Sequence, residues 1–168
     1  MATSTDVYLG NPNLKKAGTE IQFTKKQVQE WIKCKEDPLY FALNYIQIIS
    51  LDEGLVPFTM YGFQKEIMMD FHENRFNIAK LPRQTGKSTT VVAYLLHYCI
   101  FNDSVNIGIL ANKASTAREL LGRLQLAYEN LPKWIQHGIL VWNKGSVELE
   151  NGSKILAAST SASAVRGM

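Results

Sequence analysis

The chain repeats a pattern in which a short apolar run is followed by a longer helical one. Residues 76–81 are apolar between polar neighbours, which predicts a buried strand, and residues 88–101 are rich in Val, Ala, Leu and Tyr, which predicts a helix covered on most of its surface. The same order recurs with an apolar run at 105–111 and a leucine-striped helix at 116–130. Alternating strands and helices predict an α/β fold, with helices on both faces of a parallel sheet in three layers.

The sequence before residue 76 and after residue 130 predicts further helices and strands. Apolar stripes predict helices at 25–35 and 39–48, separated by an Asp-Pro pair because a residue before proline avoids the helical region. Residues 1–22 show no period, and we expect an extended or flexible arm. Near the other end, an Asn-Gly pair lies between alternating segments at 146–150 and 154–158, and this pair is the strongest two-residue signal for a β-hairpin.

The loop at 82–87, between the first predicted strand and its helix, is the main candidate for chemistry. It contains Gly86, Lys87 and the following Ser88, the last three residues of the phosphate-binding pattern G-x-x-x-x-G-K-[ST]. Gly86 lets the backbone approach a phosphate, and the amides that start the helix favour an anion. Lys87 suits the β- and γ-phosphates of a nucleotide, the Ser88 hydroxyl suits a bridging Mg²⁺ ion, and Thr89 suits the α-phosphate.

The phosphate-binding pattern is incomplete, because its first glycine falls on Leu81. The alternative is an ordinary glycine-containing turn from a strand into a helix. The predicted strand before the loop and the predicted helix after it are the context that the pattern requires, and this context favours a nucleotide site.

Three further residues bear on a nucleotide. Arg83 lies inside the loop, where a guanidinium can stabilise charge on the γ-phosphate in the transition state; an exposed surface arginine is an equally good interpretation. Gln64 lies upstream, near the start of a predicted helix that ends at about residue 73. Its carboxamide can pair with the edge of adenine while Phe63 stacks on the ring, but spacing alone favours a surface glutamine beside a core aromatic.

Composition excludes several classes of protein. The 168 residues are 46% hydrophobic and 20% charged, which is typical of one soluble globular domain with at most a small appendage. A net charge of +3 is compatible with a nucleic-acid partner. Cys34 and Cys99 are isolated and the histidines are not clustered, so we expect neither disulfides nor a zinc site. No signal-peptide pattern or membrane-spanning run is present, and we expect a protein that is not secreted.

Carboxylates suited to ATP hydrolysis are missing from the second half of the chain. A phosphate-loop ATPase needs one at a strand end to hold Mg²⁺ and usually another to orient water. The acidic residues after the loop, none of which follows an apolar run, are Asp103, Glu119, Glu129, Glu148 and Glu150. We therefore predict an arm and helical unit at 1–54 and the first half of an ATPase core at 55–168. A truncated chain, a split gene or protein splicing would each account for the end at Met168.

Five stretches of the sequence resemble the large terminase subunit of T-even-type tailed bacteriophages, the ATPase motor that packages DNA into empty capsids. They read NPNLKKAG…FTKKQVQEWIKCKED, YGFQKEIMMDF, LPRQTGKSTTV, IGILANKAS and GILVWNKGSVELENGSKILAASTSASAVRG. The resemblance covers residues 8–167, and the family tolerates a phosphate loop without the leading glycine. It implies part of a RecA-like (ASCE) phosphate-loop NTPase fold behind a small N-terminal helical unit.

The resemblance also implies roles for individual residues. The loop residues that it implies for ATP and Mg²⁺ are Gln84, Thr85, Gly86, Lys87, Ser88 and Thr89. Lys87 would contact the phosphates and Ser88 the Mg²⁺ ion, and Arg83 would act as a cis arginine finger, so Arg83 and Lys87 are the catalytic candidates. Phe63 and Gln64 would form the adenine site; relatives often carry a tyrosine at the aromatic position, so Phe63 keeps the stacking and loses a hydroxyl.

The function implied is that of the N-terminal, ATP-binding part of a packaging motor in the host cytoplasm, with negligible turnover on its own. Implied partners are double-stranded DNA, the portal protein, the small terminase subunit and the C-terminal remainder of the terminase, whose nuclease domain is not in this sequence. A superfamily 2 helicase-like ATPase shares the glutamine and the loop but is disfavoured by the GILVWNKGSVELENGS hairpin. A non-catalytic chain that adds its strands to another protein is the third interpretation.

Overall fold

The computed structural model describes residues 6–50 and 52–160. Its helices are α1 (Lys25–Glu36), α2 (Pro38–Tyr45), α3 (Gly62–Glu73), α4 (Lys87–Phe101) and α5 (Ala114–Glu129). Its strands are β1 (Val7–Tyr8), β2 (Asn11–Lys15), β3 (Gln47–Ser50), β4 (Gly54–Pro57), β5 (Asn106–Ala111), β6 (Ile139–Trp142), β7 (Ser146–Leu149) and β8 (Lys154–Ser159). Four predictions are confirmed, each with ends that agree within two residues. They are the helices α4 and α5, the strand β5 and the β7–β8 hairpin.

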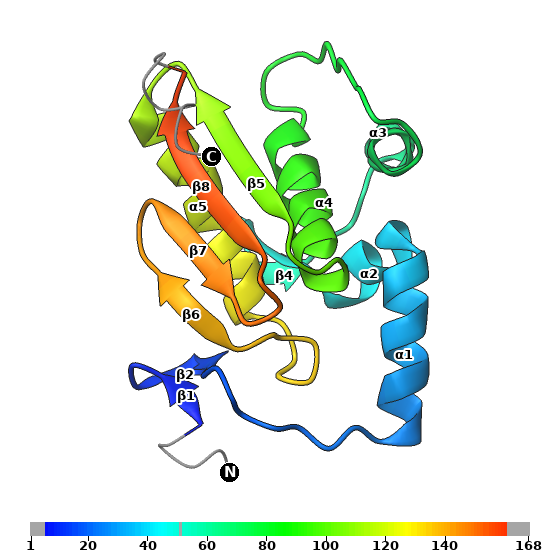
Figure 1. Cartoon of the computed structure of the whole chain (residues 1–168). Coiled ribbons are helices and arrows are strands. Elements are labelled where there is room, and N and C mark those ends of the chain that lie inside the picture. The colour runs from blue at the N-terminus through cyan, green and yellow to red at the C-terminus, as the bar shows by residue number, and fades with distance from the viewer. Residues whose placement is uncertain (1–5, 51, 161–168) are drawn as a thin grey trace.

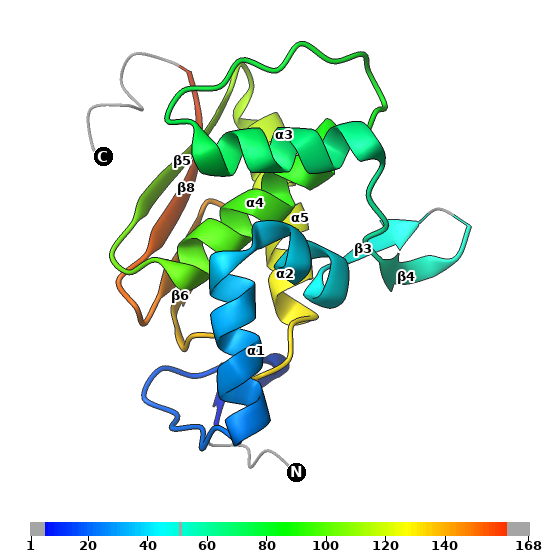
Figure 2. The ribbon, with the colours of Figure 1, turned by 90° about the vertical axis from the view of Figure 1, so that its right-hand side faces the viewer.

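A sheet with the strand order β5-β8-β7-β6 forms one layer of the molecule (Figure 1). β5 pairs with β8 in parallel, whereas β7 runs antiparallel to both β8 and β6. Period-two alternation places Ile109, Val147 and Ile155 on the face that packs toward α5, and all three are buried. α4 packs on α5, and α2 and α3 pack on α4, so the helices lie on one side of the sheet (Figure 2).

The prediction of a parallel sheet in three layers is not confirmed. The sheet is mixed, because the hairpin returns β8 antiparallel to β7 and leaves only the β5–β8 pair parallel. Its second face carries Leu110, Leu140 and Leu156, which are 41%, 51% and 38% exposed, and no helix covers this face within residues 6–50 and 52–160. What the structure supports is a mixed α/β architecture of two layers.

The predicted strand at 76–81 is wrong. This segment is irregular and exposed, with Phe76 at 83% and Ile78 fully accessible, and it connects α3 to the start of α4. A strand needs a neighbour to pair its backbone N–H and C=O groups, and no described strand lies beside this segment. Residues 76–81 have the composition of a strand, but composition does not show whether a neighbouring strand is present to pair with them.

Two N-terminal predictions also change. The helix predicted at 39–48 ends at Tyr45, and the chain continues as β3, which forms an antiparallel hairpin with β4. The arm predicted as extended or flexible contains the β1–β2 hairpin, whose Leu14 is 1% exposed, and Lys16 bridges to Ile139 at the start of β6. The arm therefore packs against the sheet layer.

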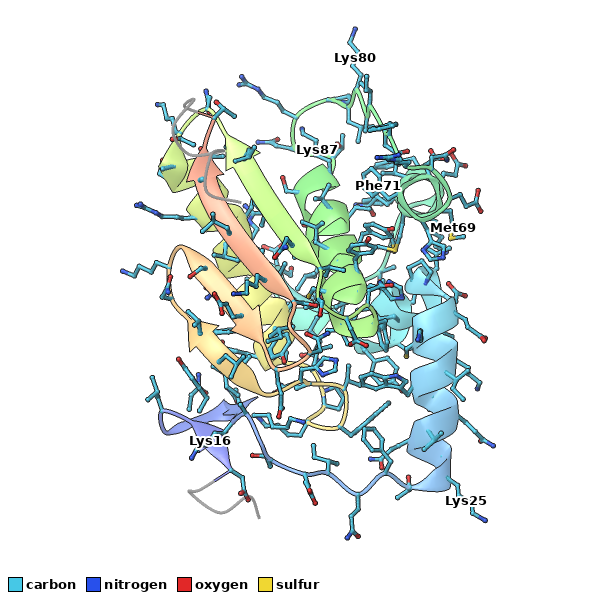
Figure 3. The ribbon with its side chains drawn as sticks, in the orientation of Figure 1. Lys16, Lys25, Met69, Phe71, Lys80 and Lys87 are labelled. Carbon is cyan, nitrogen blue, oxygen red and sulfur yellow. The ribbon has the colours of Figure 1, made fainter. Side chains whose placement is uncertain are left out.

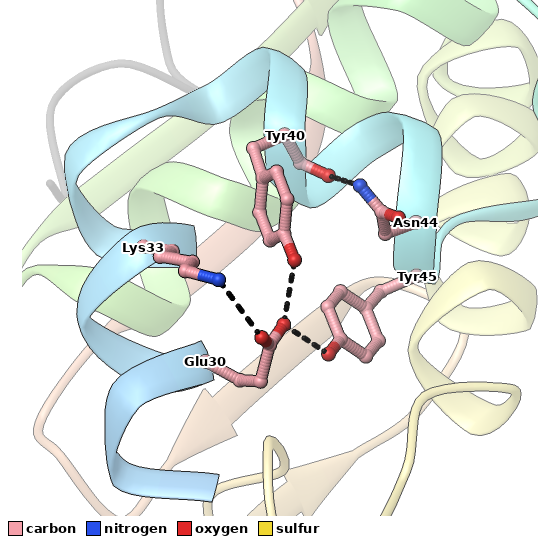
Figure 4. Close-up of polar contacts among 5 residues, drawn as sticks. All are labelled: Glu30, Lys33, Tyr40, Asn44 and Tyr45. Carbon is pink, nitrogen blue, oxygen red and sulfur yellow. Dashed lines mark hydrogen bonds and ion pairs between the residues drawn. The ribbon is translucent and has the colours of Figure 1, made fainter. Parts of the chain in front are cut away.

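A cluster of polar side chains joins α1 to α2 (Figure 4). The hydroxyls of Tyr40 and Tyr45 donate to Glu30 Oε2 at 2.7 and 3.0 Å, and Lys33 donates to Glu30 Oε1 at 3.3 Å. The hydrogen bond from Tyr40, followed by that from Tyr45, lowers the pKa of the Glu30 carboxyl. The carboxylate thus links α1 to α2.

The hydrophobic core runs through both predicted parts of the chain. Phe41 of α2 packs edge-on against Phe101 of α4 with ring centroids 5.3 Å apart, and His97 Nε2 of α4 lies 2.8 Å from the carbonyl oxygen of Cys34 in α1. The predicted division at residue 54 falls at the turn of the β3–β4 hairpin. No helix of the described residues combines the length and apolar character needed to cross a membrane.

Candidate functional site

The candidate phosphate loop lies at the end of the molecule where β5 and β8 also finish (Figure 1). Gln84 and Gly86 both adopt the left-handed conformation, with φ of 62° and 73°, and these two residues turn the chain into α4. Gly86 is the N-cap residue, and its carbonyl oxygen accepts from the Thr90 N–H at 3.1 Å and from the Thr90 hydroxyl at 3.3 Å. The predicted glycine thus occupies a position that favours glycine on conformational grounds.

The start of α4 is suited to an anion. No side chain caps its first amides, and its first turn contains no acidic residue. The uncapped N–H groups and the helix dipole therefore give this end a partial positive charge. Lys87 adds a full charge at the same point and is exposed, and Lys80 projects from the preceding segment at the same end of the molecule (Figure 3). A phosphate group fits this combination of backbone amides and ammonium.

The loop closes on itself around one carbonyl oxygen. The Lys87 ammonium donates to the Pro82 carbonyl at 3.0 Å, and the Thr85 hydroxyl donates to the same oxygen at 3.1 Å. Pro82 and Lys87 are exposed, so water competes for these contacts and an anionic ligand can replace them. The Pro82 carbonyl was not predicted, and no pattern in the sequence identifies a backbone acceptor of this kind.

Ser88 and Thr89 follow Lys87 in the first turn of α4, and both are half-buried. Ser88 borders an apolar groove lined by Phe71 of α3, Leu81 and Leu120 of α5. Arg83 is exposed within the loop and forms no ion pair with any described residue. The loop residues predicted from the sequence are therefore together in space, with Arg83 on the solvent side.

The predicted adenine residues behave differently from each other. Phe63 is 37% exposed and stacks on Tyr61, with ring centroids 5.8 Å apart and planes 9° apart. Gln64 is 2% exposed and bonds within the protein at both ends of its amide. Sequence reasoning missed Tyr61 as part of this aromatic surface, although its i, i+2 spacing from Phe63 was visible.

No group of three or more His, Cys, Asp or Glu side chains that could hold a metal ion occurs in the described part of the chain. Glu119 pairs with Arg123 at 2.7 Å and Glu148 with Lys154 at 3.3 Å, while Glu150 accepts from the Gly18 amide at 2.8 Å. These three carboxylates have structural partners.

The two thiols are not candidates for chemistry. Cys34 and Cys99 are both fully buried. Burial raises the pKa of each thiol to about 12, so neither forms an appreciable thiolate near neutral pH.

Comparison with known families gives a match over this same region. The model of the family described as "Terminase large subunit, T4likevirus-type, N-terminal" matches residues 78–168. The matched range is more than half of the chain and includes the loop, α4, α5 and the whole β5-β8-β7-β6 sheet. The resemblance inferred for residues 8–77 lies outside the match and stays a prediction. The chain therefore belongs to the N-terminal family of T4-like large terminase subunits.

Proposed function

We propose that this chain is the ATP-binding part of a viral DNA-packaging motor and that residues 82–89 hold the triphosphate. The observation that carries the proposal is the start of α4, where a left-handed glycine, uncapped amides and an exposed lysine meet. Membership of the terminase family supports packaging over a superfamily 2 helicase-like ATPase, whose loop is similar.

Each loop residue has a proposed task. When the nucleotide binds, the Lys87 ammonium releases its hydrogen bond to the Pro82 carbonyl oxygen and donates to the β- and γ-phosphates. The phosphates carry full charges and therefore accept a stronger hydrogen bond than a carbonyl does. The amides of Gly86 to Thr89 bind phosphate oxygens, and Gln84 and Thr85 set the curve of the loop. Arg83 places its guanidinium on the γ-phosphate as charge develops there.

Ser88 is the residue that fits a Mg²⁺ ion carried by the nucleotide. Its hydroxyl is in the first turn of α4, next to Lys87. Mg²⁺ usually keeps several waters and takes one or two protein ligands beside phosphate oxygens, whose charge it neutralises. The described residues include no group of three or more His, Cys, Asp or Glu side chains that could hold a metal ion. We therefore propose that hydrolysis needs an acidic residue from outside the described residues, and that this chain alone turns over little ATP.

The proposed partners follow from the packaging role. They are double-stranded DNA, the portal protein, the small terminase subunit and the C-terminal remainder of the terminase, all within the host cytoplasm. A positive net charge of +3 and the cluster of basic residues at the loop end are compatible with a polyanionic partner.

The decisive experiment compares Lys87→Ala with Lys80→Ala. Both lysines are exposed and lie at the same end of the molecule, but only Lys87 stands at the start of α4. Removing Lys87 should weaken Mg-ATP binding by roughly ten- to a hundred-fold, the loss expected for one charge-assisted contact. Isothermal titration calorimetry measures the affinities. Equal affinity in wild type and Lys87→Ala would contradict the assignment of the site.

A second function is supported by the exposed segment before the loop. Phe76 and Ile78 are 83% and fully exposed, and the second face of the sheet carries exposed leucines. These surfaces suit a chain that completes another polypeptide without binding nucleotide. Thermal melting with Mg-ATP separates the two functions, because a ligand that binds only the folded state raises its stability, and no shift is expected for a purely structural partner.

A further inference from the structure

A groove lies at the end of the molecule opposite to the phosphate loop, between the N-terminal arm and α1. Lys16 and Lys25, at the two ends of the connection from β2 to α1, mark this end in Figure 3, and Lys87 marks the other. The groove has a volume of about 390 Å³, within the range of about 300–1,000 Å³ that is typical of binding pockets. We infer that it binds an acidic segment of a partner protein, whose apolar side chains fill the groove while one carboxylate meets Lys15.

Apolar side chains of α1 and of the arm line the groove and remain half open to solvent. Val28, Trp31 and Ile32 follow each other at helical spacing and so share one face of α1. Val28 and Ile32 are 46% and 48% exposed. Phe23 of the arm is 45% exposed, and its ring meets that of Trp31 edge-on with centroids 6.0 Å apart. Exposed apolar side chains that gather along one groove, rather than being scattered singly, are typical of an interaction site.

Lys15 of β2 adds a positive charge to this apolar lining. Its side chain is half-buried, and its ammonium forms no ion pair with any carboxylate of the described residues. Burial lowers the pKa of Lys15 against the opposing effect of the Glu150 charge. Glu150 itself accepts from the backbone amides of Gly18 and Gly138 at 2.8 and 3.2 Å. An ammonium that has lost part of its water and lacks a partner attracts an incoming carboxylate more strongly than a fully solvated one does.

The lining favours a protein segment over a nucleic acid. Grooves that follow single-stranded nucleic acid combine a row of basic residues with aromatic rings that stack on the bases. Among the described residues that line this groove, Lys15 carries the only ammonium, and Val28 and Ile32 are aliphatic. The Trp31 ring already makes an edge contact with His137 at 5.8 Å. A turn of an amphipathic helix, in which an apolar side chain stands beside an Asp or Glu, matches this combination of charge and apolar surface.

Selection from a library of short random peptides displayed on phage tests the inference on the whole chain. Counter-selection against Ile32→Glu, which places a charge in the apolar lining, removes peptides that bind elsewhere. We expect the enriched peptides to carry Asp or Glu beside aromatic or aliphatic residues. Thermal melting verifies that Ile32→Glu is folded, as expected for a side chain that is half exposed.

Fluorescence polarisation then measures the affinity of one enriched peptide and of its counterpart with Asn or Gln in place of Asp or Glu. Wild type should bind the acidic peptide roughly ten-fold or more tightly than the neutral one, the difference expected for one charge-assisted contact. Lys15→Met should remove this preference. The control Lys16→Met, an exposed neighbour outside the lining, should retain it, and so should Lys87→Ala at the nucleotide loop.

Several results would overturn the inference. A selection that yields no peptide sensitive to Ile32→Glu, or only peptides without carboxylates, would show that the groove does not take an acidic segment. Equal affinity of wild type for the acidic and neutral peptides would show the same, even if Lys15→Met failed to fold. Binding of oligothymidylate that depends on Lys15 would assign the groove to nucleic acid, and sedimentation that reveals self-association dependent on Lys15 would assign it to a second copy of the chain.

Discussion

His97 shows how burial sets the chemistry of a single residue. Its Nε2 lies 2.8 Å from the Cys34 carbonyl oxygen and so carries the proton, while Nδ1 is buried without a hydrogen-bond partner. The rings of Phe41 and Phe101 lie against the imidazole at centroid distances of 5.7 and 4.9 Å. Burial lowers the pKa of His97 to about 4, against the opposing effect of the Cys34 carbonyl.

This pKa predicts that the protein loses stability in mild acid. The unfolded histidine binds a proton below pH 6.5 and the folded one does not until about pH 4, so the free energy of unfolding falls as the pH drops through that window. His97 alone should account for about 2 kcal/mol between pH 6.5 and 4.5, at up to about 1.4 kcal/mol per pH unit. Urea denaturation across this range measures the effect.

The control for His97 is the exposed His72 of α3. His97→Gln should flatten the pH dependence, whatever it does to stability at pH 7, and His72→Gln should reduce the slope only slightly, because the charge of His72 lowers the pKa of His97 less than burial does. The buried His137 retains a smaller slope in both variants, because burial lowers its pKa as well. An unchanged slope in His97→Gln would mean that His97 titrates normally in the folded protein.

At the scale of elements, Gln136 shows how one side chain attaches the N-terminal arm to the helical layer. It is 2% exposed, and Nε2 donates to the carbonyl oxygens of Asn13, Tyr128 and Leu131 at 3.0, 3.1 and 2.9 Å. Its Oε1 accepts from the Lys15 N–H at 3.1 Å. The carboxamide therefore joins β2 to the segment that follows α5.

Gln136→Leu should detach the arm and destabilise the protein. Leucine fills similar space but leaves several buried backbone groups unpaired, at a cost of about 1–3 kcal/mol for each group that water cannot reach. Chemical denaturation gives the change in stability, and hydrogen exchange at the Lys15 amide reports the arm itself. Gln125→Leu is the matched control, because Gln125 makes one exposed bond to the Asn143 carbonyl. Comparable effects in both variants would contradict this role of Gln136.

Helices and turns that depend on a local sequence pattern were predicted well. Strands that depend on pairing with another segment of the chain were not. The apolar residues of α5 recur on one face and those of α4 cover most of its surface, and both patterns are set by neighbouring residues of the helix. The segment at 76–81 has the composition of a strand, yet pairing depends on where other strands lie. Residues 47 and 48 of β3 were assigned to the end of the helix predicted at 39–48, and pairing with β4 makes them part of a strand.

At the scale of the whole molecule, apolar side chains are exposed to solvent in the segment that precedes the candidate phosphate loop. Phe76 is 83% exposed, with the Arg75 guanidinium 5.1 Å from its ring centroid, Ile78 is fully exposed, and one face of the sheet bears exposed leucines. Apolar surface left exposed in this way favours an interaction site or a liability for aggregation. It lies outside the core that joins α1, α2 and α4.

Replacing both exposed residues, in Phe76→Ser with Ile78→Ser, should reduce self-association and leave stability nearly unchanged. Side chains as exposed as these typically contribute less than about 0.5 kcal/mol to the free energy of unfolding. By contrast, Leu96→Ala in the buried core should lower that free energy by about 2–5 kcal/mol. Light scattering and thermal melting measure the two quantities. A marked drop in the melting temperature of the double variant would show that residues 76 and 78 are packed in solution.

The sequence alone determined the α/β class, the helices α4 and α5 and the β7–β8 hairpin, and it predicted a phosphate site at the loop with Lys87 and Ser88. These follow from period, turn chemistry and a short motif, all of which act over neighbouring residues. Tertiary structure decided that the sheet is mixed, that 76–81 is unpaired, and that Gln64 is buried. Each of these depends on segments that are distant along the chain, because burial and strand pairing are properties of neighbours in space.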